Sequence, residues 1–341
     1  MTKKKETAFS IFTESIGLYF SNFSQFLKYM TFPVLGQLFG LGLVLALTLI
    51  YSKNMPYLIE KYSALDNFNT LILAAIVITL PGMAIFIKAF WEYLVAYGAV
   101  NSMLDNMLKS GKVYDFQAHT ELIKRRTPAF VGLWLIFGVF SLNAAIPFFW
   151  VPAGVCAVFC VLIFQVFTYE PELSPFGCVK KSFNLIKGNF LPTFMLMAGI
   201  GALTYIAIPQ LGSMLFEKTK LLEILSGCVT PLLEELPIKN MNEFLSVYGL
   251  PLININEAAK FAVTVTLTQI LVQYTLPMRS ILWGMWYRKL NSELPESGET
   301  KRKSKLKRPS ERLMEASKKK YSTKRLDKNI LKRAMEKDDE E

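Results

Sequence analysis

Residues 127–169 read TPAFVGLWLIFGVFSLNAAIPFFWVPAGVCAVFCVLIFQVFTY, a run of 43 residues without a charged side chain. A helix rises about 1.5 Å per residue, so about 20 apolar residues cross a hydrocarbon core roughly 30 Å thick. A single span of this length would need extreme tilt, and Pro147 and Pro152 favour a turn within 143–152. We therefore predict two transmembrane helices here, near 128–146 and 151–169.

The same length criterion finds four more apolar runs. Residues 29–52 hold 24 residues without a charge, and the other predicted spans lie near 70–97, 190–216 and 259–287. The whole chain is 52% hydrophobic with a mean hydropathy of +0.31, more than the core of a soluble protein needs. Backbone polar groups in lipid must pair within their own segment, and no alternation typical of a membrane β-barrel occurs. We predict an all-α integral membrane protein with about six transmembrane helices in a membrane domain of residues 29–290.

The distribution of Lys and Arg predicts that both termini are cytoplasmic. Segments 1–28, 105–127, 170–189 and 288–341 carry 4, 5, 3 and 18 of these residues, whereas 51–69, 143–152 and 217–259 carry 2, 0 and 3. The first set is expected in the cytoplasm, and the excursion 217–258, with its LLEIL and MNEFL segments, is expected outside as short helices on the membrane surface. The basic tail, 291–341, has few apolar residues and is predicted to be disordered in the cytoplasm.

Two segments have the pattern of amphipathic helices at the membrane interface. In residues 1–28, the apolar positions at helical spacing are Phe9, Phe12, Ile16, Phe20, Phe23 and Leu27. The second segment, 175–187, follows Ser174 as a natural N-cap and has Pro175 in its first turn. Its apolar side chains, expected to face lipid, are Phe176, Val179, Phe183 and Ile186. Its basic side chains, expected to contact anionic headgroups, are Lys180, Lys181 and Lys187. Each segment ends near an Asn–Phe pair, Asn22–Phe23 or Asn189–Phe190, which suggests two half-repeats.

The candidate polar or lipid-binding site consists of Lys88, Glu92, Gln273 and Arg279. Charges in lipid are costly and tend to have a partner or a function. Lys88 and Glu92 are four residues apart and can form an ion pair, while Arg279 can extend to the headgroups. The alternative is a polar pathway or an anionic lipid site built by these residues.

Small residues in the first span favour close helix packing. Gly36 and Gly40 form a GxxxG motif, which lets two helix backbones approach each other in a membrane. We expect packing within the chain more than dimerisation.

The sequence offers few residues for catalysis or metal binding. His119 is the only histidine and is expected at the surface, so zinc-binding helices and Ser-His-Asp arrangements are absent. The four cysteines, at 156, 160, 178 and 228, form no CxxC pair, and neither a P-loop nor GxSxG occurs. We therefore expect no enzymatic activity, no catalytic residues, no cofactor and no metal.

Several cytoplasmic motifs resemble those of a bacterial group of six-span membrane proteins. They are SGKVYDFQA at 110–118, KRRTP at 124–128, YEPELSPFGCVKKSFNLIKGNF at 169–190 and WYRKL at 286–290. The group comprises the YciC-like family and the membrane domain attached to some glycerophosphodiester phosphodiesterases. The resemblance implies a six-span fold in the bacterial cytoplasmic membrane and brings no catalytic residues with it. The long basic tail and the 217–258 excursion depart from the pattern of the group.

The favoured function is a non-enzymatic membrane protein that organises or handles lipids or other envelope components. Its expected partners are membrane lipids, with anionic headgroups in contact with the basic helix. The alternative is a small-solute or ion transporter that uses the intramembrane charges, and an intramembrane enzyme has the least support. Nucleic acid is not expected as a partner, because the charges are segregated rather than spread over one basic surface. Protein partners and the oligomeric state are left open.

Overall fold

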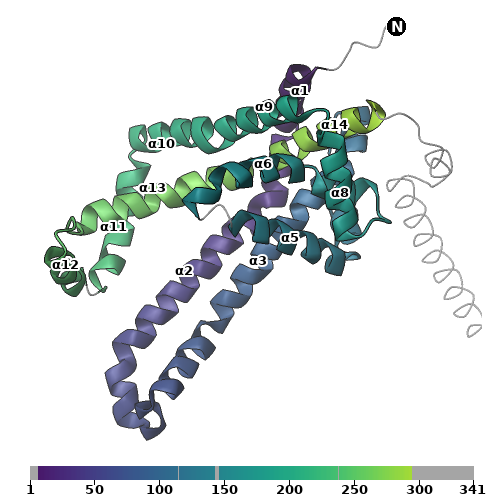
Figure 1. Ribbon diagram of the computed structural model, residues 1–341. Helices are drawn as coiled ribbons and strands as arrows, with labels where there is room; N and C mark the ends of the chain where they lie inside the picture. Colours follow the sequence, from purple (N-terminus) through teal and green to yellow (C-terminus); the bar gives the residue numbers. More distant parts are fainter. Residues whose placement is uncertain (1–6, 114, 143–145, 237, 294–341) are drawn as a thin grey trace, which may run out of the picture. The chain divides into compact units, whose positions relative to one another are not determined.

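The computed structural model describes residues 7–113, 115–142, 146–236 and 238–293, and within them every regular element is helical (Figure 1). The α-helices are α1 (Ala8–Ser21), α2 (Phe23–Lys61), α3 (Phe68–Ser110), α4 (Phe116–Lys124), α5 (Thr127–Leu142), α6 (Trp150–Cys160), α7 (Ile163–Tyr169), α8 (Pro175–Ile186), α9 (Phe190–Gly201), α10 (Ile208–Lys218), α11 (Leu221–Glu234), α12 (Ile238–Val247), α13 (Ile255–Tyr274) and α14 (Leu276–Glu293). Shorter helical elements are η1 (Ser63–Asp66), η3 (Pro147–Phe149) and the π-helical segment η4 (Ala202–Ala207). The part of the chain described has no strand, which confirms the prediction of an all-helical protein. From residue 294 onward, the predicted tail lies outside the described residues.

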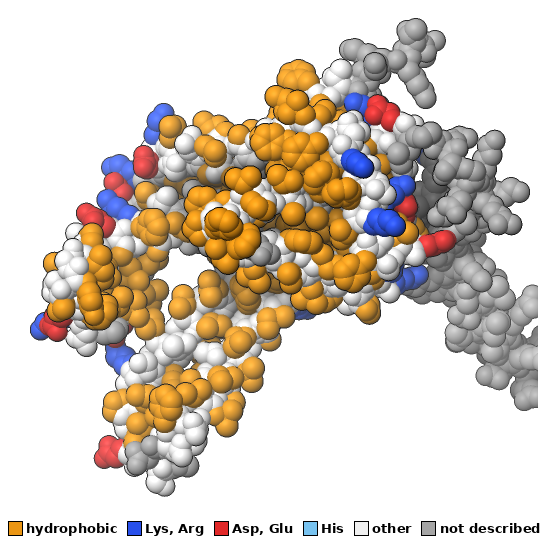
Figure 2. Space-filling model, in the orientation of Figure 1, with side chains coloured by type: hydrophobic (Ala, Val, Ile, Leu, Met, Phe, Trp, Pro, Cys, Tyr) orange, Lys and Arg blue, Asp and Glu red, His pale blue; other side chains and the backbone are white. Residues whose placement is uncertain are grey.

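Five helical stretches of the described chain are long and apolar enough to cross a membrane. They are Phe23–Lys61, Phe68–Ser110, Pro147–Tyr169, Phe190–Lys218 and Ile255–Glu293. Little of their apolar surface is covered by protein, since only 11% of the most apolar window of α3 is buried. Hydrophobic side chains likewise cover most of the visible surface of α5 and α6 (Figure 2). Exposed apolar helices of this length are stable in lipid rather than in water, so the chain has the features of a multi-pass membrane protein.

The remaining predicted span, near 128–146, corresponds to α5, which is apolar but has only 16 residues. At the helical rise this is about 24 Å, shorter than a hydrocarbon core of roughly 30 Å. Residues 143–145, where the predicted turn begins, lie outside the described residues. The turn continues in η3, which has Pro147 at its start. The count of six spans and the cytoplasmic position of both termini stay predictions.

The described residues divide into two compact units. The first unit comprises the described residues within 7–22, 98–194 and 280–293, and the second comprises those within 23–97 and 195–279. Each unit contains segments that are far apart in the sequence, so each is held together by tertiary packing. The sites described below each lie within one unit.

In the second unit, α2 and α3 approach each other through glycines (Figure 1). A Cβ placed on Gly40 would lie 2.5 Å from the backbone N of Phe86 and 2.8 Å from the carbonyl O of Gly82. A Cβ placed on Gly36 would lie 2.8 Å from the Cβ of Ala89. The predicted GxxxG motif therefore lies against α3 of the same chain. A core cluster of the same unit contains Met30, Val34, Ala96 and Leu276.

In the first unit, an aromatic cluster joins α5 to α7. The Phe130 side chain is fully buried, with ring centroids of Phe164 and Phe167 at 6.0 Å and 5.6 Å. Trp134, one turn after Phe130 on α5, has its ring centroid 4.3 Å from that of Phe164. Aromatic pairs at these separations contribute beyond their buried area, so the cluster fixes how α5 and α7 pack.

The first amphipathic helix ends at Asn22, which interrupts the helix before α2 begins at Phe23. The Asn22 side chain donates to the Gly111 carbonyl (3.1 Å) and accepts from the Val113 backbone N–H (2.9 Å). These bonds hold Asn22 outside the helical conformation and attach the junction between α1 and α2 to the loop that follows α3. Phe23 and Leu27, predicted as part of the amphipathic stripe, therefore lie in α2.

Two of the predicted spans contain irregular helix. The span near 259–287 is divided at Thr275, between α13 and α14, because Pro277 has no N–H with which to continue the helical bonding. The span near 190–216 contains the π-helical segment η4. Beyond it, the predicted LLEIL and MNEFL helices are present as parts of α11 and α12.

Candidate functional site

Arg279 lies in the first turn of α14, directly after the break at Thr275. Its Nη1 donates to the Tyr205 hydroxyl, and its Nη2 donates to the Tyr93 hydroxyl (3.4 Å) and the Val272 carbonyl (3.2 Å). The guanidinium carbon also lies 5.2 Å from the centroid of the Tyr205 ring. The Val272 carbonyl lies in the last turn of α13 and also accepts from the backbone N–H (3.2 Å) and the hydroxyl (2.6 Å) of Thr275. The C-terminal end of α13 therefore stabilises the positive charge of Arg279.

The π-helical segment η4 places Tyr205 beside Arg279. Single turns of π-helix are rare and are found frequently at functional sites. Within this turn, Thr204 is fully buried and donates to the Ile200 carbonyl at 2.8 Å, whereas Tyr205 is 56% exposed. The irregular turn thus directs one polar side chain inward and presents the next to Arg279 at the surface.

The Arg279 cluster, defined as Arg279, Tyr93 and Tyr205, has more hydrogen-bond donors than acceptors. The buried Nε of Arg279 has no partner. Both tyrosine hydroxyls accept from Arg279, and neither donates a hydrogen bond to any described residue. No described carboxylate forms an ion pair with Arg279. The cluster therefore carries a positive charge together with several unfilled donors.

The structure brings only part of the sequence-predicted site together. Gln273 lies in the last turn of α13, and its buried Oε1 has no hydrogen-bond partner and no bond to Arg279. Lys88 is exposed on α3, where its Nζ lies 5.8 Å from the centroid of the Phe32 ring of α2. Glu92 is half-buried on the same helix, and its ion pair with Lys88 stays a prediction.

The second candidate site is on α8, which begins and packs as its local sequence predicts. Ser174 caps the helix by accepting from the Gly177 backbone N–H at 3.2 Å, and Pro175 occupies the first turn. The buried face of α8 carries Cys178, Ser182, Leu185 and Ile186. The prediction that Ile186 faces lipid is wrong, because the packing of α8 on α6 and α7 buries it fully.

The exposed face of α8 alternates aromatic and basic residues. Phe176, Lys180, Phe183 and Lys187 follow one another at intervals of four, three and four residues, which places them on one helix face. All four side chains are exposed, Phe176 by 76%. We call this row the α8 stripe. The lysines were expected to lie opposite the phenylalanines, but the helical period puts Lys180 and Lys187 on the same face as the two rings.

Lys181 lies on another face of α8 and is half-buried. Its Nζ lies 3.4 Å from Glu170 Oε1, and the same oxygen accepts a hydrogen bond from the Tyr287 hydroxyl at 2.9 Å. The charge of Lys181 is therefore balanced within the protein. Of the three predicted headgroup contacts, Lys180 and Lys187 form no ion pair with any residue that the structure describes.

A buried polar network in the first unit was not predicted from the sequence. The Asn101 carbonyl accepts from the Tyr169 hydroxyl (3.1 Å), and its side-chain Oδ1 accepts from Gln165 Nε2 (3.3 Å). One turn further along α3, Asp105 pairs with Arg288 of α14 at 2.8 Å. Asn101 and Gln165 are polar residues within apolar runs, and that signal could have drawn attention to them. Their pairing has no sequence signal, because the partners are far apart along the chain.

His119 is buried, with 4% of its surface exposed, so the prediction of a surface histidine is wrong. Its Nδ1 lies 2.6 Å from Ser102 Oγ, and that hydroxyl donates to the Ala99 carbonyl at 2.9 Å. Because the Ser102 hydroxyl donates its hydrogen bond to the Ala99 carbonyl, it acts as an acceptor toward His119. We therefore assign the N–H of the neutral imidazole to Nδ1, which donates to Ser102 Oγ. This arrangement does not activate Ser102 as a nucleophile. Burial lowers the pKa of His119 to about 4, so the imidazole is neutral at neutral pH.

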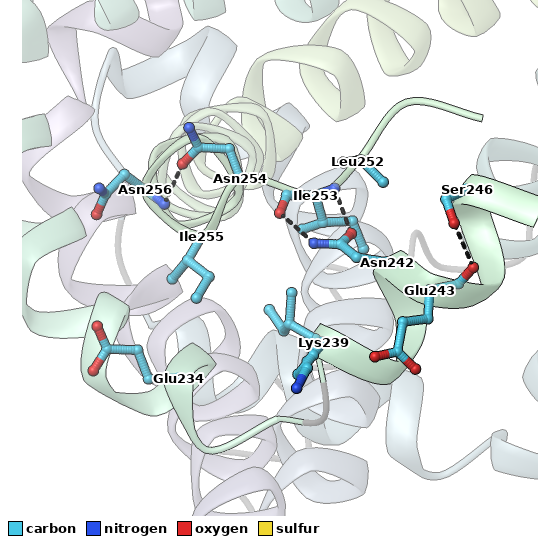
Figure 3. A pocket seen from close by; sticks show the side chains of 11 residues that line it. Glu234, Lys239, Asn242, Glu243, Ser246, Leu252, Ile253, Asn254, Ile255 and Asn256 are labelled. Carbon is cyan, nitrogen blue, oxygen red and sulfur yellow. Dashed lines mark hydrogen bonds between the residues drawn. The ribbon is translucent and has the colours of Figure 1, made fainter. Parts of the chain in front are cut away.

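A pocket of about 730 Å³ lies between α12 and the start of α13 (Figure 3). Asn242 fixes its wall, since its Nδ2 donates to the Ile253 carbonyl (3.1 Å) and its Oδ1 accepts from the Ile253 N–H (2.7 Å). Glu234, Lys239 and Glu243 line the same pocket, so its charges are mixed (Figure 3). None of the sequence-predicted site residues lies there.

The described residues contain no group of three or more His, Cys, Asp or Glu side chains that could hold a metal ion. Burial raises the pKa of the Cys178 thiol to about 11, which keeps it protonated at neutral pH. What the two candidate sites offer chemically is positive charge beside apolar surface. Such surfaces recognise anionic groups carried by amphiphiles.

Models of protein families, curated proteins and solved structures were compared with the chain, and none of them matches it. The resemblance to the YciC-like group therefore stays a prediction.

Proposed function

We propose that the chain is a non-enzymatic, multi-pass protein of the bacterial cytoplasmic membrane that binds and organises anionic lipids in the cytoplasmic leaflet. The observation that carries this proposal is the α8 stripe. The Phe176 ring, 76% exposed, can enter the boundary between headgroups and acyl chains, and the exposed edge of Phe183, whose ring stacks on Phe159 of α6, can contact it. The lysines of the stripe can reach the lipid phosphates. Alternation of the two residue types along one exposed face suits this interface and neither bulk water nor the acyl region.

The packing of α8 supports the proposal. The helix is capped by Ser174 and covered on its other face by α6 and α7, so the stripe is held in place before lipid binds. A preformed surface loses less conformational entropy on binding than a helix that folds on the membrane. Lys and Arg side chains gather around α8, beside the apolar surface of α5 and α6 (Figure 2). The excess of Lys and Arg in the segments expected in the cytoplasm supports a position of this region at the inner leaflet.

The proposal is tested by reversing the charges of the stripe. In nanodiscs that contain phosphatidylglycerol and phosphatidylcholine, native mass spectrometry counts the lipids retained by the full chain. One lysine near an anionic surface contributes about 1 kcal/mol, so the double variant Lys180→Glu/Lys187→Glu should retain phosphatidylglycerol about thirtyfold more weakly.

A matched control reverses two exposed lysines of the second unit, Lys239→Glu/Lys260→Glu. These lysines lie in or beside the segment expected on the outer face, so retention should stay near the wild-type level. Equal retention by both double variants, or equal loss in both, contradicts the proposal.

A second candidate function is small-solute or ion transport. It is favoured by the break at Thr275 and the π-helical segment η4, because irregular helix at membrane depth is a common feature of transporter binding sites. Under this alternative, Arg279→Leu abolishes anion uptake into proteoliposomes while the protein stays folded. Unchanged uptake in that variant rejects transport through this cluster.

A further inference from the structure

Among the described residues, the Arg279 cluster has no counter-ion. The guanidinium is half-buried in a segment apolar enough to span a membrane, and its partners are two neutral hydroxyls and one carbonyl. A cation in an apolar environment without a paired anion is costly, and the partial charge of a helix end offsets only part of this cost. The cluster is therefore poised for an anion from outside the described chain.

The unfilled donors define what that anion must offer. Arg279 Nε is buried without an acceptor, and the hydroxyl protons of Tyr93 and Tyr205 have none among the described residues. A buried donor such as Arg279 Nε is normally satisfied. A group that only accepts hydrogen bonds, and does so through several oxygens, meets all of these needs together. Phosphate has this property, and arginine binds it with well-directed hydrogen bonds.

We propose that Arg279, Tyr93 and Tyr205 form a binding site for the phosphate group of a membrane phospholipid. The site lies in the second unit and is independent of the α8 stripe. Tyr205 is 56% exposed, and the stretch Phe190–Lys218 that carries it is apolar enough to span a membrane, so apolar surface surrounds the site. Acyl chains can cover that surface while the phosphate reaches Arg279. Inorganic phosphate has no group that would contact that apolar surface.

The test measures binding of short-chain phosphatidylglycerol to the full chain in detergent by isothermal titration calorimetry. Tyr205→Phe removes one hydroxyl donor and keeps the ring, and Arg279→Lys keeps the charge and removes the Nε donor. Each hydrogen bond to a charged acceptor lowers the dissociation constant about tenfold, so each variant should bind phosphatidylglycerol about tenfold more weakly. The matched control, Tyr248→Phe, removes a hydroxyl from an exposed tyrosine outside the cluster and should bind like wild type.

Two further ligands identify the source of the phosphate. The diacylglycerol with the same chains lacks the phosphate and should bind weakly, with no change in the Tyr205→Phe variant. Inorganic phosphate should not displace the lipid at similar concentrations, and complete displacement would overturn the lipid source in favour of a soluble phosphate. If both Tyr205→Phe and Arg279→Lys bind phosphatidylglycerol as tightly as wild type, the site does not exist. Because α8 is intact in all of these variants, that result would leave the α8 stripe unaffected.

Discussion

Gly40 offers the most direct test of how α2 and α3 pack. A Cβ at this position would lie 2.5 Å from the backbone N of Phe86, 2.8 Å from its Cα and 2.8 Å from the Gly82 carbonyl. The shortest of these falls about 0.9 Å inside the 3.4 Å at which ordinary van der Waals contact begins. All three atoms belong to the backbone, so no side-chain rotation relieves the clash. In Gly40→Ala, the two helices must move apart.

We expect this movement to lower the free energy of unfolding by about 2 kcal/mol, within the range of about 1–3 kcal/mol found for overpacked cores. Gly42, two residues further along α2, is the matched control, because a Cβ there meets no atom within 4 Å. Gly42→Ala should be neutral, or stabilising by up to about 1 kcal/mol through helix propensity. The two variants therefore differ only in what the new methyl group contacts.

The assay is unfolding of the full chain in mixed micelles, followed by circular dichroism as the fraction of SDS rises. Gly40→Ala should unfold at a lower SDS fraction than wild type, and Gly42→Ala should not. Unfolding of Gly40→Ala at the wild-type SDS fraction would refute the close approach of α2 and α3. Equal destabilisation by both substitutions would attribute the effect to α2 itself rather than to its contact with α3.

Two other predictions concern the first unit. Burial lowers the pKa of His119 from 6.5 to about 4, so on acidification the unfolded chain takes up the proton first. Stability should therefore be unaffected by this group above pH 6.5 and should fall by up to about 3 kcal/mol between pH 6.5 and 4. Unfolding measured across this range should show that loss in wild type beyond what His119→Gln shows, and parallel profiles would contradict it. Asn22→Ala leaves the buried Val113 N–H without an acceptor, which should cost about 2 kcal/mol. Hydrogen exchange should become faster at Val113, and unchanged protection there would show that Asn22 does not hold the loop.

The features that could be predicted from the sequence are those set by short-range patterns. Ser174, Pro175 and the residues after them specify the start of α8 through contacts within one turn, and the structure has this cap. Apolar length alone predicted the long apolar helices, since the thickness of the bilayer sets the length that a span needs. The second of the two central spans corresponds to the apolar stretch Pro147–Tyr169, whereas α5, at the place of the first, is shorter than expected and that span stays a prediction.

The features that could not be predicted depend on which neighbour covers which face. Ile186 was expected to face lipid because it is apolar, yet α6 and α7 cover that side of the helix. His119 was expected at the surface because charged residues flank it, yet its ring points to Ser102 in the core. Arg279 was found from its charge, but its partners Tyr93 and Tyr205 come from distant segments. No local pattern links such residues, so only the fold brings them together.

The claim on which the lipid proposals depend is that α8 faces the cytoplasm and that the 217–258 segment lies outside. Lys180→Cys and Lys239→Cys, each made as the only cysteine in a background without the four native cysteines, test it with a membrane-impermeant maleimide. In intact cells, the cysteine at position 239 should be labelled, and the one at position 180 should be labelled only after permeabilisation. Labelling of both positions from the same side would mean that the chain does not cross the membrane an odd number of times between them, and would contradict the proposed topology.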